Sequence, residues 1–144
     1  MSTPFDVLNS MLASSLRFWR GTMASGPARQ PAKHLQLYEF EACPFCRLVR
    51  EALTELDIDA VIYPSPHGGR RFRPKVARLG GKQQFPFLVD PNSGESMYES
   101  ADIVDYLYRR YSGRRPPTRL LRPIDVSTSV LAGIARLRAG ARAR

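Results

Sequence analysis

The sequence has few cysteines and no long apolar run. No apolar stretch reaches the roughly 18 residues that a membrane-spanning helix needs, so a transmembrane segment is not predicted. Only two cysteines occur in 144 residues, which excludes a small secreted domain held together by disulfides. Twelve prolines and ten glycines interrupt the chain too often for a pure helical bundle. The rest, 43% hydrophobic and 24% charged, predicts one ordinary globular domain with extensions.

Positive charge is concentrated at the two ends of the chain. Residues 1–34 carry +3, with four basic residues against one acid, and residues 114–144 carry +7, with eight arginines against one acid. Residues 35–113 hold ten basic and eleven acidic residues, a net charge of −1. A nearly neutral middle argues against a nucleic-acid-binding face built into the fold. The basic tails remain candidates for contact with an anionic membrane surface.

Two extensions flank the middle of the chain. Residues 1–34 are predicted to form an amphipathic helix followed by a linker; its apolar face comprises Phe5, Leu8, Met11, Leu12, Leu16 and Trp19. This helix either docks on the following domain or on a partner protein, or belongs to an organelle transit peptide. Residues 113–144 are predicted to contain one basic amphipathic helix, with Val126, Val130, Ile134 and Leu137 on its apolar face.

The middle of the chain, residues 35–112, alternates strand and helix signals. The predicted elements are, in order, a strand at 35–40, a helix at 44–56, a strand at 58–62, a helix at 72–79, strands at 85–89 and 95–98, and a helix at 100–111 capped by Ser100. The order β-α-β-α-β-β-α predicts an α/β domain with a four-stranded mixed sheet in an αβα layered fold. The first two strands should be parallel and the last two antiparallel.

The Cys43-Pro44-Phe45-Cys46 motif lies where the first predicted strand gives way to a helix. At a helix start, unpaired backbone N–H groups and the helix dipole favour an anion, which lowers the pKa of the first thiol. Cys46, one turn further on, can reach back and release a mixed disulfide. We therefore expect a redox-active pair, with the Cys43 sulfur open to solvent and Pro44 stiffening the turn.

Other interpretations of the two cysteines remain open. A structural zinc site needs four ligands, but the only histidines, His34 and His67, match no usual spacing, so no metal is expected. A further alternative to a redox pair is that both cysteines are buried and unreactive. Glu39 and Glu41 precede the motif, and either carboxylate would raise the pKa of Cys43 if it lay close to the sulfur.

Two further elements suit a peptide-like ligand. Phe85-Pro86 begins a strand-like run, where proline cannot donate to a ladder, and a cis bond would turn the Phe85 backbone towards the ligand. That backbone could then pair with an extended peptide. Glu99-Ser100 lies at a helix start, where free N–H groups and a hydroxyl suit a carboxylate and Glu99 suits an amine. Together with Cys43 they describe a site for a thiol tripeptide.

Residues 35–112 resemble the N-terminal, glutathione-binding thioredoxin-fold domain of glutathione transferases, with a glutaredoxin-type motif. The matching segments are Leu-Tyr-Glu-Phe-Glu-Ala-Cys-Pro-Phe-Cys, Gly-Gly-Lys-Gln-Gln-Phe-Pro-Phe-Leu-Val-Asp and Tyr-Glu-Ser-Ala-Asp-Ile. The resemblance implies glutathione as cosubstrate, Cys43 as nucleophile and Cys46 as resolving thiol. The residues that it implies for glutathione binding are Phe45, Arg47, Lys82, Phe85, Pro86, Glu99 and Ser100.

The function expected is therefore a glutathione-dependent thiol–disulfide oxidoreductase acting on disulfides or mixed disulfides. Residues 113–144 are too short for the second, helical domain of transferases, so a transferase or isomerase activity completed by a partner is an alternative. A non-catalytic module that binds glutathione or a cluster is another. A reversible dithiol suits a reducing compartment, so we expect a cytoplasmic protein, or a plastid protein if the N-terminus is a transit peptide.

Overall fold

A computed structural model describes residues 8, 11–12, 15, 19–116 and 131 of the chain. Its elements are β1 (Leu35–Glu39), α2 (Pro44–Glu55), β2 (Ala60–Pro64), α3 (Arg73–Gly80), β3 (Phe87–Asp90), β4 (Glu95–Met97), α4 (Ser100–Leu107) and the π-helical turn η1 (Tyr108–Ser112). The predicted order β-α-β-α-β-β-α is confirmed. Most of the first predicted helix, and all but one residue of the last, lie outside the described residues.

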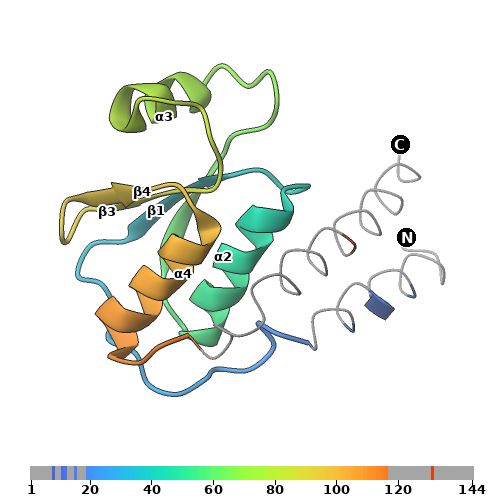
Figure 1. Cartoon of the computed structure of the whole chain (residues 1–144), viewed down its shortest axis with the longest axis vertical. Helices are drawn as coiled ribbons and strands as arrows, with labels where there is room; N and C mark the ends of the chain where they lie inside the picture. Colours follow the sequence, from blue (N-terminus) through green and yellow to red (C-terminus); the bar gives the residue numbers. More distant parts are fainter. Residues whose placement is uncertain (1–7, 9–10, 13–14, 16–18, 117–130, 132–144) are drawn as a thin grey trace.

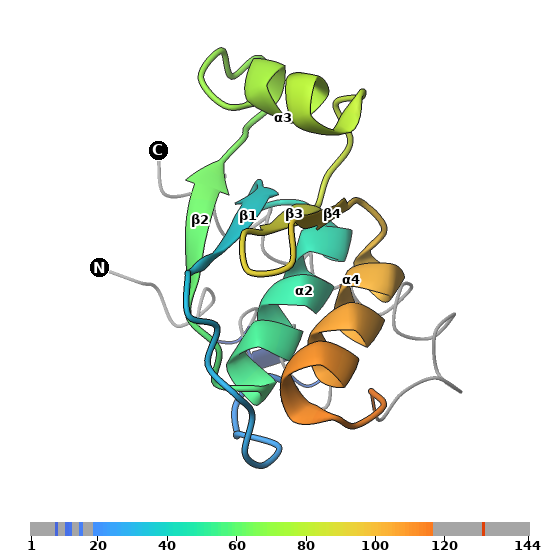
Figure 2. The ribbon, with the colours of Figure 1, turned by 90° about the vertical axis from the view of Figure 1, so that its left-hand side faces the viewer.

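The four strands form one mixed sheet in the order β2-β1-β3-β4. β1 and β2 are parallel, while β3 is antiparallel to both β1 and β4. α2 and α4 lie side by side on one face of the sheet and α3 covers the other face (Figures 1 and 2). The predicted αβα layered fold, that of thioredoxin-like domains, is confirmed.

α2 forms because its apolar residues repeat at steps of three and four. Val49 and Leu53 are buried on the face that meets the sheet, and Leu56 caps the C-terminal end. Pro44 occupies the first turn, where its missing N–H costs no hydrogen bond. The helix therefore begins immediately after Cys43.

A separate core lies on each face of the sheet. Beneath α2 and α4, buried aliphatic side chains from the helices pack against Leu35, Leu37 and Leu88 of the sheet. Beneath α3 the core is aromatic and is centred on Tyr38, Phe87 and Val76. Because Leu37 and Tyr38 are neighbours in β1, one strand supplies both cores.

Some boundaries differ from those predicted. β3 starts at Phe87, two residues after the predicted start, because Pro86 cannot donate to the ladder. α3 ends at Gly80 as expected, with Gly81 left-handed at φ +84°, but Leu79 is 50% exposed and does not face the core. β2 runs from Ala60 to Pro64, two residues later than the predicted strand at 58–62, and as an edge strand it leaves Val61 and Ile62 exposed.

The segment before β1 is fastened to the C-terminal end of α2. Arg20 forms two hydrogen bonds with the Glu55 carboxylate, both 3.0 Å long, and the Tyr108 hydroxyl donates to the same carboxylate at 2.7 Å. The Ser25 amide donates to the Glu55 carbonyl at 2.7 Å. Glu55 therefore joins the N-terminal segment, α2 and the end of α4.

Glu55→Gln should lower the free energy of unfolding by about 2 kcal/mol at neutral pH, since it removes a charge-assisted pair from a site where the Glu55 side chain is only 10% exposed. Burial alone would raise the pKa of Glu55, but hydrogen bonds from Arg20 and Tyr108 outweigh it and lower the pKa. The stabilisation is thus present above the ordinary pKa of 4.5 and is lost as the pH falls through the lowered value.

Urea unfolding measured across this pH range checks the prediction. Glu41→Gln is the control, because Glu41 pairs with Arg50 but is 71% exposed and should change stability by less than about 1 kcal/mol. Equal effects of the two substitutions at neutral pH would contradict the role assigned to Glu55.

Candidate functional site

The two cysteines are joined by a hydrogen bond at the start of α2. Cys43 is the N-cap residue, with extended backbone angles, and its sulfur accepts the Cys46 N–H at 3.2 Å. The Cys43 N–H donates to the Phe40 carbonyl at 3.1 Å, which fixes the loop between β1 and α2. No disulfide joins the two cysteines, and both are buried. The sulfur of Cys43 thus lies over the amide groups that open the helix.

This arrangement separates the acidities of the two thiols. The side-chain hydrogen bond from Cys46 lowers the pKa of Cys43 from 9.0 to about 7, with help from the backbone amides of Cys46 and Phe45 and against the effect of burial. The same bond, together with burial, raises the pKa of Cys46. Cys43 is therefore the more acidic thiol of the pair, and Cys46 is the less acidic one.

Glu39 acts against the thiolate. It is buried, with 6% exposure, at the end of β1, and its charge raises the pKa of both cysteines. Burial also raises the pKa of Glu39 itself, partly offset by Arg50, whose guanidinium nitrogen lies 3.8 Å from the carboxylate. Glu39 therefore raises the pKa of Cys43, as expected of an acid close to the motif, whereas the amides at the helix start lower it.

The expectation of an open Cys43 sulfur is wrong. Cys43 is only 4% exposed and Cys46 is fully buried. The reason is the N-cap hydrogen bond, because a side chain that bonds to the Cys46 amide folds back over the first turn of the helix. The neighbouring Phe45 is the residue of the motif that faces solvent, with 41% exposure.

The loop that contains Phe85 lies beside the cysteine loop. The Phe85 and Phe40 rings meet edge to face, with centroids 6.1 Å apart, and the Phe85–Pro86 peptide bond is cis. Arg73, at the start of α3, places its guanidinium 4.7 Å from the centroid of the Phe85 ring. The Arg73 Nε also donates to the Pro66 carbonyl at 2.6 Å, so the side chain is held in place.

Tyr98 holds the other end of this loop. Its hydroxyl accepts the Lys82 N–H at 3.3 Å and donates to the Lys82 carbonyl at 2.8 Å, and the Lys82 ammonium lies 4.8 Å from the centre of the Tyr98 ring. A side chain at position 80 would collide with the Tyr98 ring, which is why Gly80 is needed there.

The start of α4 reaches the same loop through Glu99. Gln84 donates to the Glu99 carboxylate at 2.5 Å. Glu99, and not Ser100, is the N-cap residue, and its side chain makes no capping bond; Ser100 is the first residue of the helix and is 8% exposed. The prediction of Ser100 as cap is therefore wrong by one residue. The amides that open α4 have no partner within the helix, as in any α-helix, and lie beside a carboxylate and a hydroxyl.

The structure thus links most of the predicted site residues. A chain of contacts leads from Cys43 through Phe40 and Phe85 to Gln84 and then to Glu99. Arg47 is placed differently. Its Nε lies 3.1 Å from the Glu51 carboxylate, and its side chain lines a cavity of about 270 Å³ beside residues 20–22.

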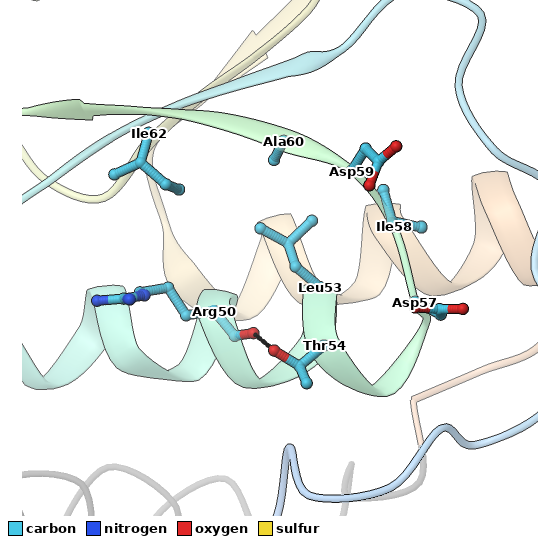
Figure 3. Close-up of a pocket in the computed structure, with 8 residues that line it drawn as sticks. All are labelled: Arg50, Leu53, Thr54, Asp57, Ile58, Asp59, Ala60 and Ile62. Carbon is cyan, nitrogen blue, oxygen red and sulfur yellow. Dashed lines mark hydrogen bonds between the residues drawn. The ribbon is translucent and has the colours of Figure 1, made fainter.

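A second cavity, of about 310 Å³, lies between α2 and the edge strand β2. Figure 3 shows Leu53 and Arg50 of α2 on one side and Ala60 and Ile62 of β2 on the other. None of the predicted site residues lines it. Within the described part of the chain, no group of three or more His, Cys, Asp or Glu side chains is placed to hold a metal ion. None of the described helices is long and apolar enough to cross a membrane.

The model of the glutathione S-transferase N-terminal domain matches residues 37–115, more than half of the chain. The chain belongs to this family. Among solved structures, a glutathione transferase from Bombyx mori shares the fold, with a TM-score of 0.53 and 22% sequence identity over 66% of this chain. The match spans 45% of the silkworm protein. The comparison with curated proteins found no match. The family member described here therefore comprises a transferase-type N-terminal domain with a Cys-x-x-Cys pair at the start of α2.

Three residues of the site were missed by the sequence analysis. Arg73 is one of several basic residues in and before α3, and nothing in the sequence distinguishes it from Lys75 or Arg78. Gln84 and Tyr98 act on a loop and on a helix start that are distant in sequence, so only the folded chain reveals their contacts. Both residues lie in the segments that carry the family resemblance, but no pattern in those segments indicated a role for either.

Cys46→Ala should raise the pKa of Cys43 from about 7 towards 9.0, because it removes the hydrogen bond that lowers the pKa most. Glu39→Gln should shift the same pKa downwards, because it removes a nearby negative charge. The pH dependence of thiolate absorbance, or of alkylation rate, measures both shifts. Shifts in the same direction would refute this account of the site.

Proposed function

We propose that this domain is a glutathione-dependent thiol–disulfide oxidoreductase, with Cys43 as nucleophile and Cys46 as resolving thiol. The observation that carries the proposal is the hydrogen bond between the two cysteines at the N-cap of α2. The Cys46 side chain, with help from the amide in this bond, lowers the pKa of Cys43 to about 7, and the bond between the two side chains together with burial raises the pKa of Cys46. A thiol with a pKa near ambient pH is both ionised and nucleophilic, which is the best compromise for attack on a disulfide.

The reaction proceeds by two exchanges. The Cys43 thiolate attacks a substrate disulfide, forming a mixed disulfide and releasing one substrate sulfur as thiolate, which takes up a proton. Cys46 then loses its proton and attacks Cys43, which releases the second substrate thiolate and leaves a Cys43–Cys46 disulfide. Two glutathione molecules reduce that disulfide in the same two steps and leave as glutathione disulfide. The electrons that reduce the substrate thus come from glutathione.

Access to the sulfur needs one side-chain movement. Because Cys43 is 4% exposed and its sulfur bonds to the Cys46 amide, the attacking sulfur must turn from that amide towards the ligand. Rotation about the bond from Cα to Cβ achieves this between staggered rotamers.

Glutathione would lie along the loop that precedes β3. The backbone of Phe85 would pair with the cysteinyl part, with Pro86 holding that peptide plane, and Glu99 and Ser100 would bind the γ-glutamyl amine and carboxylate. We assign the glycyl carboxylate to Arg73, whose guanidinium lies over Phe85. Lys82, held by Tyr98, is a second cation on the same loop.

Cys43→Ser should slow the glutathione-dependent reduction of a mixed disulfide by about a hundredfold or more, because a serine hydroxyl is not ionised near neutral pH. Cys46→Ser should retain the first exchange and accumulate the mixed disulfide with glutathione, detected as an added mass on Cys43. Full activity of Cys43→Ser would refute the proposal. Turnover of an electrophile by a variant lacking both cysteines would instead favour a transferase.

Arg73→Ala should weaken glutathione binding by roughly tenfold or more, the effect expected from one lost charge-assisted hydrogen bond. Lys75→Ala is the matched control, because Lys75 is two residues further on and lies over the rings of Tyr38 and Tyr63. Calorimetry should also include glutathione with its glycyl carboxylate converted to an amide. The wild-type protein should bind the amide analogue as weakly as the Arg73→Ala variant binds glutathione. The variant should bind glutathione and the analogue with equal affinity. A variant that still prefers the natural ligand would overturn the assignment.

A further inference from the structure

Exposed apolar side chains gather in the segment that precedes the domain. Ten large apolar residues of the described chain are exposed, and five of them precede residue 24: Leu8, Met11, Leu12, Trp19 and Met23. Their exposed fractions run from 49% to 79%. Scattered exposed apolar residues are normal on any protein, but a concentration in one short segment indicates a surface that binds something.

The same segment is repeated at the other end of the chain. Residues 4–25 align with residues 123–144 without a gap, and nine of the 22 positions are identical. Pro-x-Asp-Val begins both copies, Ser-x-Leu-Ala follows, and an arginine comes four residues after the alanine. Leu12 in the first copy corresponds to Leu131 in the second, and each is 51% exposed. One chain therefore carries two versions of one amphipathic segment, before and after the domain.

Charge identifies the kind of surface that the two segments fit. The repeat copies carry +1 and +3, and the tails that contain them carry +3 and +7. Arg20 of the first copy is paired with Glu55, so most of the positive charge that can face a membrane lies in the C-terminal tail. Like charges oppose the packing of these segments on those of a second copy, whereas an anionic bilayer attracts them. Both copies combine apolar residues with arginine, a composition that suits the interface of a bilayer.

We propose that the two repeated segments bind the surface of an anionic membrane, with Leu12 and Leu131 inserted among the lipids and the thioredoxin-like domain outside. A single weak anchor, such as one myristoyl chain, gives only marginal, reversible attachment, and stable binding takes two signals. Linking them through one folded domain makes the second binding event intramolecular and raises the overall affinity. The duplication in the sequence supplies this pair.

The fluorescence of a native tryptophan can report this binding. Trp19 is its only tryptophan, belongs to the first segment and is 50% exposed. Vesicles of phosphatidylcholine mixed with phosphatidylglycerol should shift its fluorescence to shorter wavelength and carry the full chain with them in flotation. Vesicles of phosphatidylcholine alone should do neither, and high salt should release the bound protein.

Matched leucine substitutions test the two segments separately. Leu12→Glu and Leu131→Glu should each weaken vesicle binding at least about tenfold, because each loses an inserted side chain and adds a charge that anionic lipid repels. Leu79→Glu is the control, since Leu79 is 50% exposed but belongs to α3. All three variants should reduce a mixed disulfide at the wild-type rate, so the result does not depend on the proposed chemistry.

The proposal is overturned if Trp19 fluorescence does not respond to anionic vesicles, or if Leu79→Glu weakens binding as much as Leu12→Glu. It is also overturned if sedimentation shows, without lipid, a dimer that Leu12→Glu dissociates. In that case a second copy of the chain covers the apolar segment.

Discussion

The proposed chemistry depends on the hydrogen bond between the Cys46 amide and the Cys43 sulfur. This bond caps α2, lowers the pKa of one thiol and orients the sulfur over the first turn of the helix. It also buries that sulfur, because a side chain that caps the helix points towards the first turn and not towards solvent. The stability of the helix start and part of the acidity of Cys43 therefore have one physical origin, and the larger part of that acidity comes from the Cys46 side chain. The resting position of the sulfur follows from the amide bond.

The rest of the fold brings other groups to that helix start. β1 leads into the cysteine loop, and the antiparallel strand β3 brings Phe85 beside Phe40. The hairpin of β3 and β4 then returns the chain to Glu99, which Gln84 contacts. Three segments distant in sequence meet at one end of the strands because β3 is antiparallel to both of its neighbours in the order β2-β1-β3-β4. Membership of the transferase family and the positions of the thiols agree with a ligand at this end of the sheet.

The sequence predicted the topology and the position of the thiols because those depend on local signals. Apolar spacing in α2, Pro44 in its first turn and the glycines after α3 each specify structure within a few residues. The exposure of Cys43 depends on one rotamer, which no periodicity encodes. The contact of Arg73 with Phe85 depends on how α3 lies on the sheet, a long-range packing result that composition does not report. The cap at Glu99 differs by one residue from the prediction because serine is merely the more frequent residue at such positions.

The fastening at Glu55 has a mechanical consequence. Arg20 grips the last turn of α2, whereas the thiols occupy its beginning, so the helix separates the two by its own length, about 18 Å for 12 residues. A load applied to the leading segment would thus act on the end of α2 that lies opposite the two cysteines. The domain can be held from that side without disturbing the start of the helix.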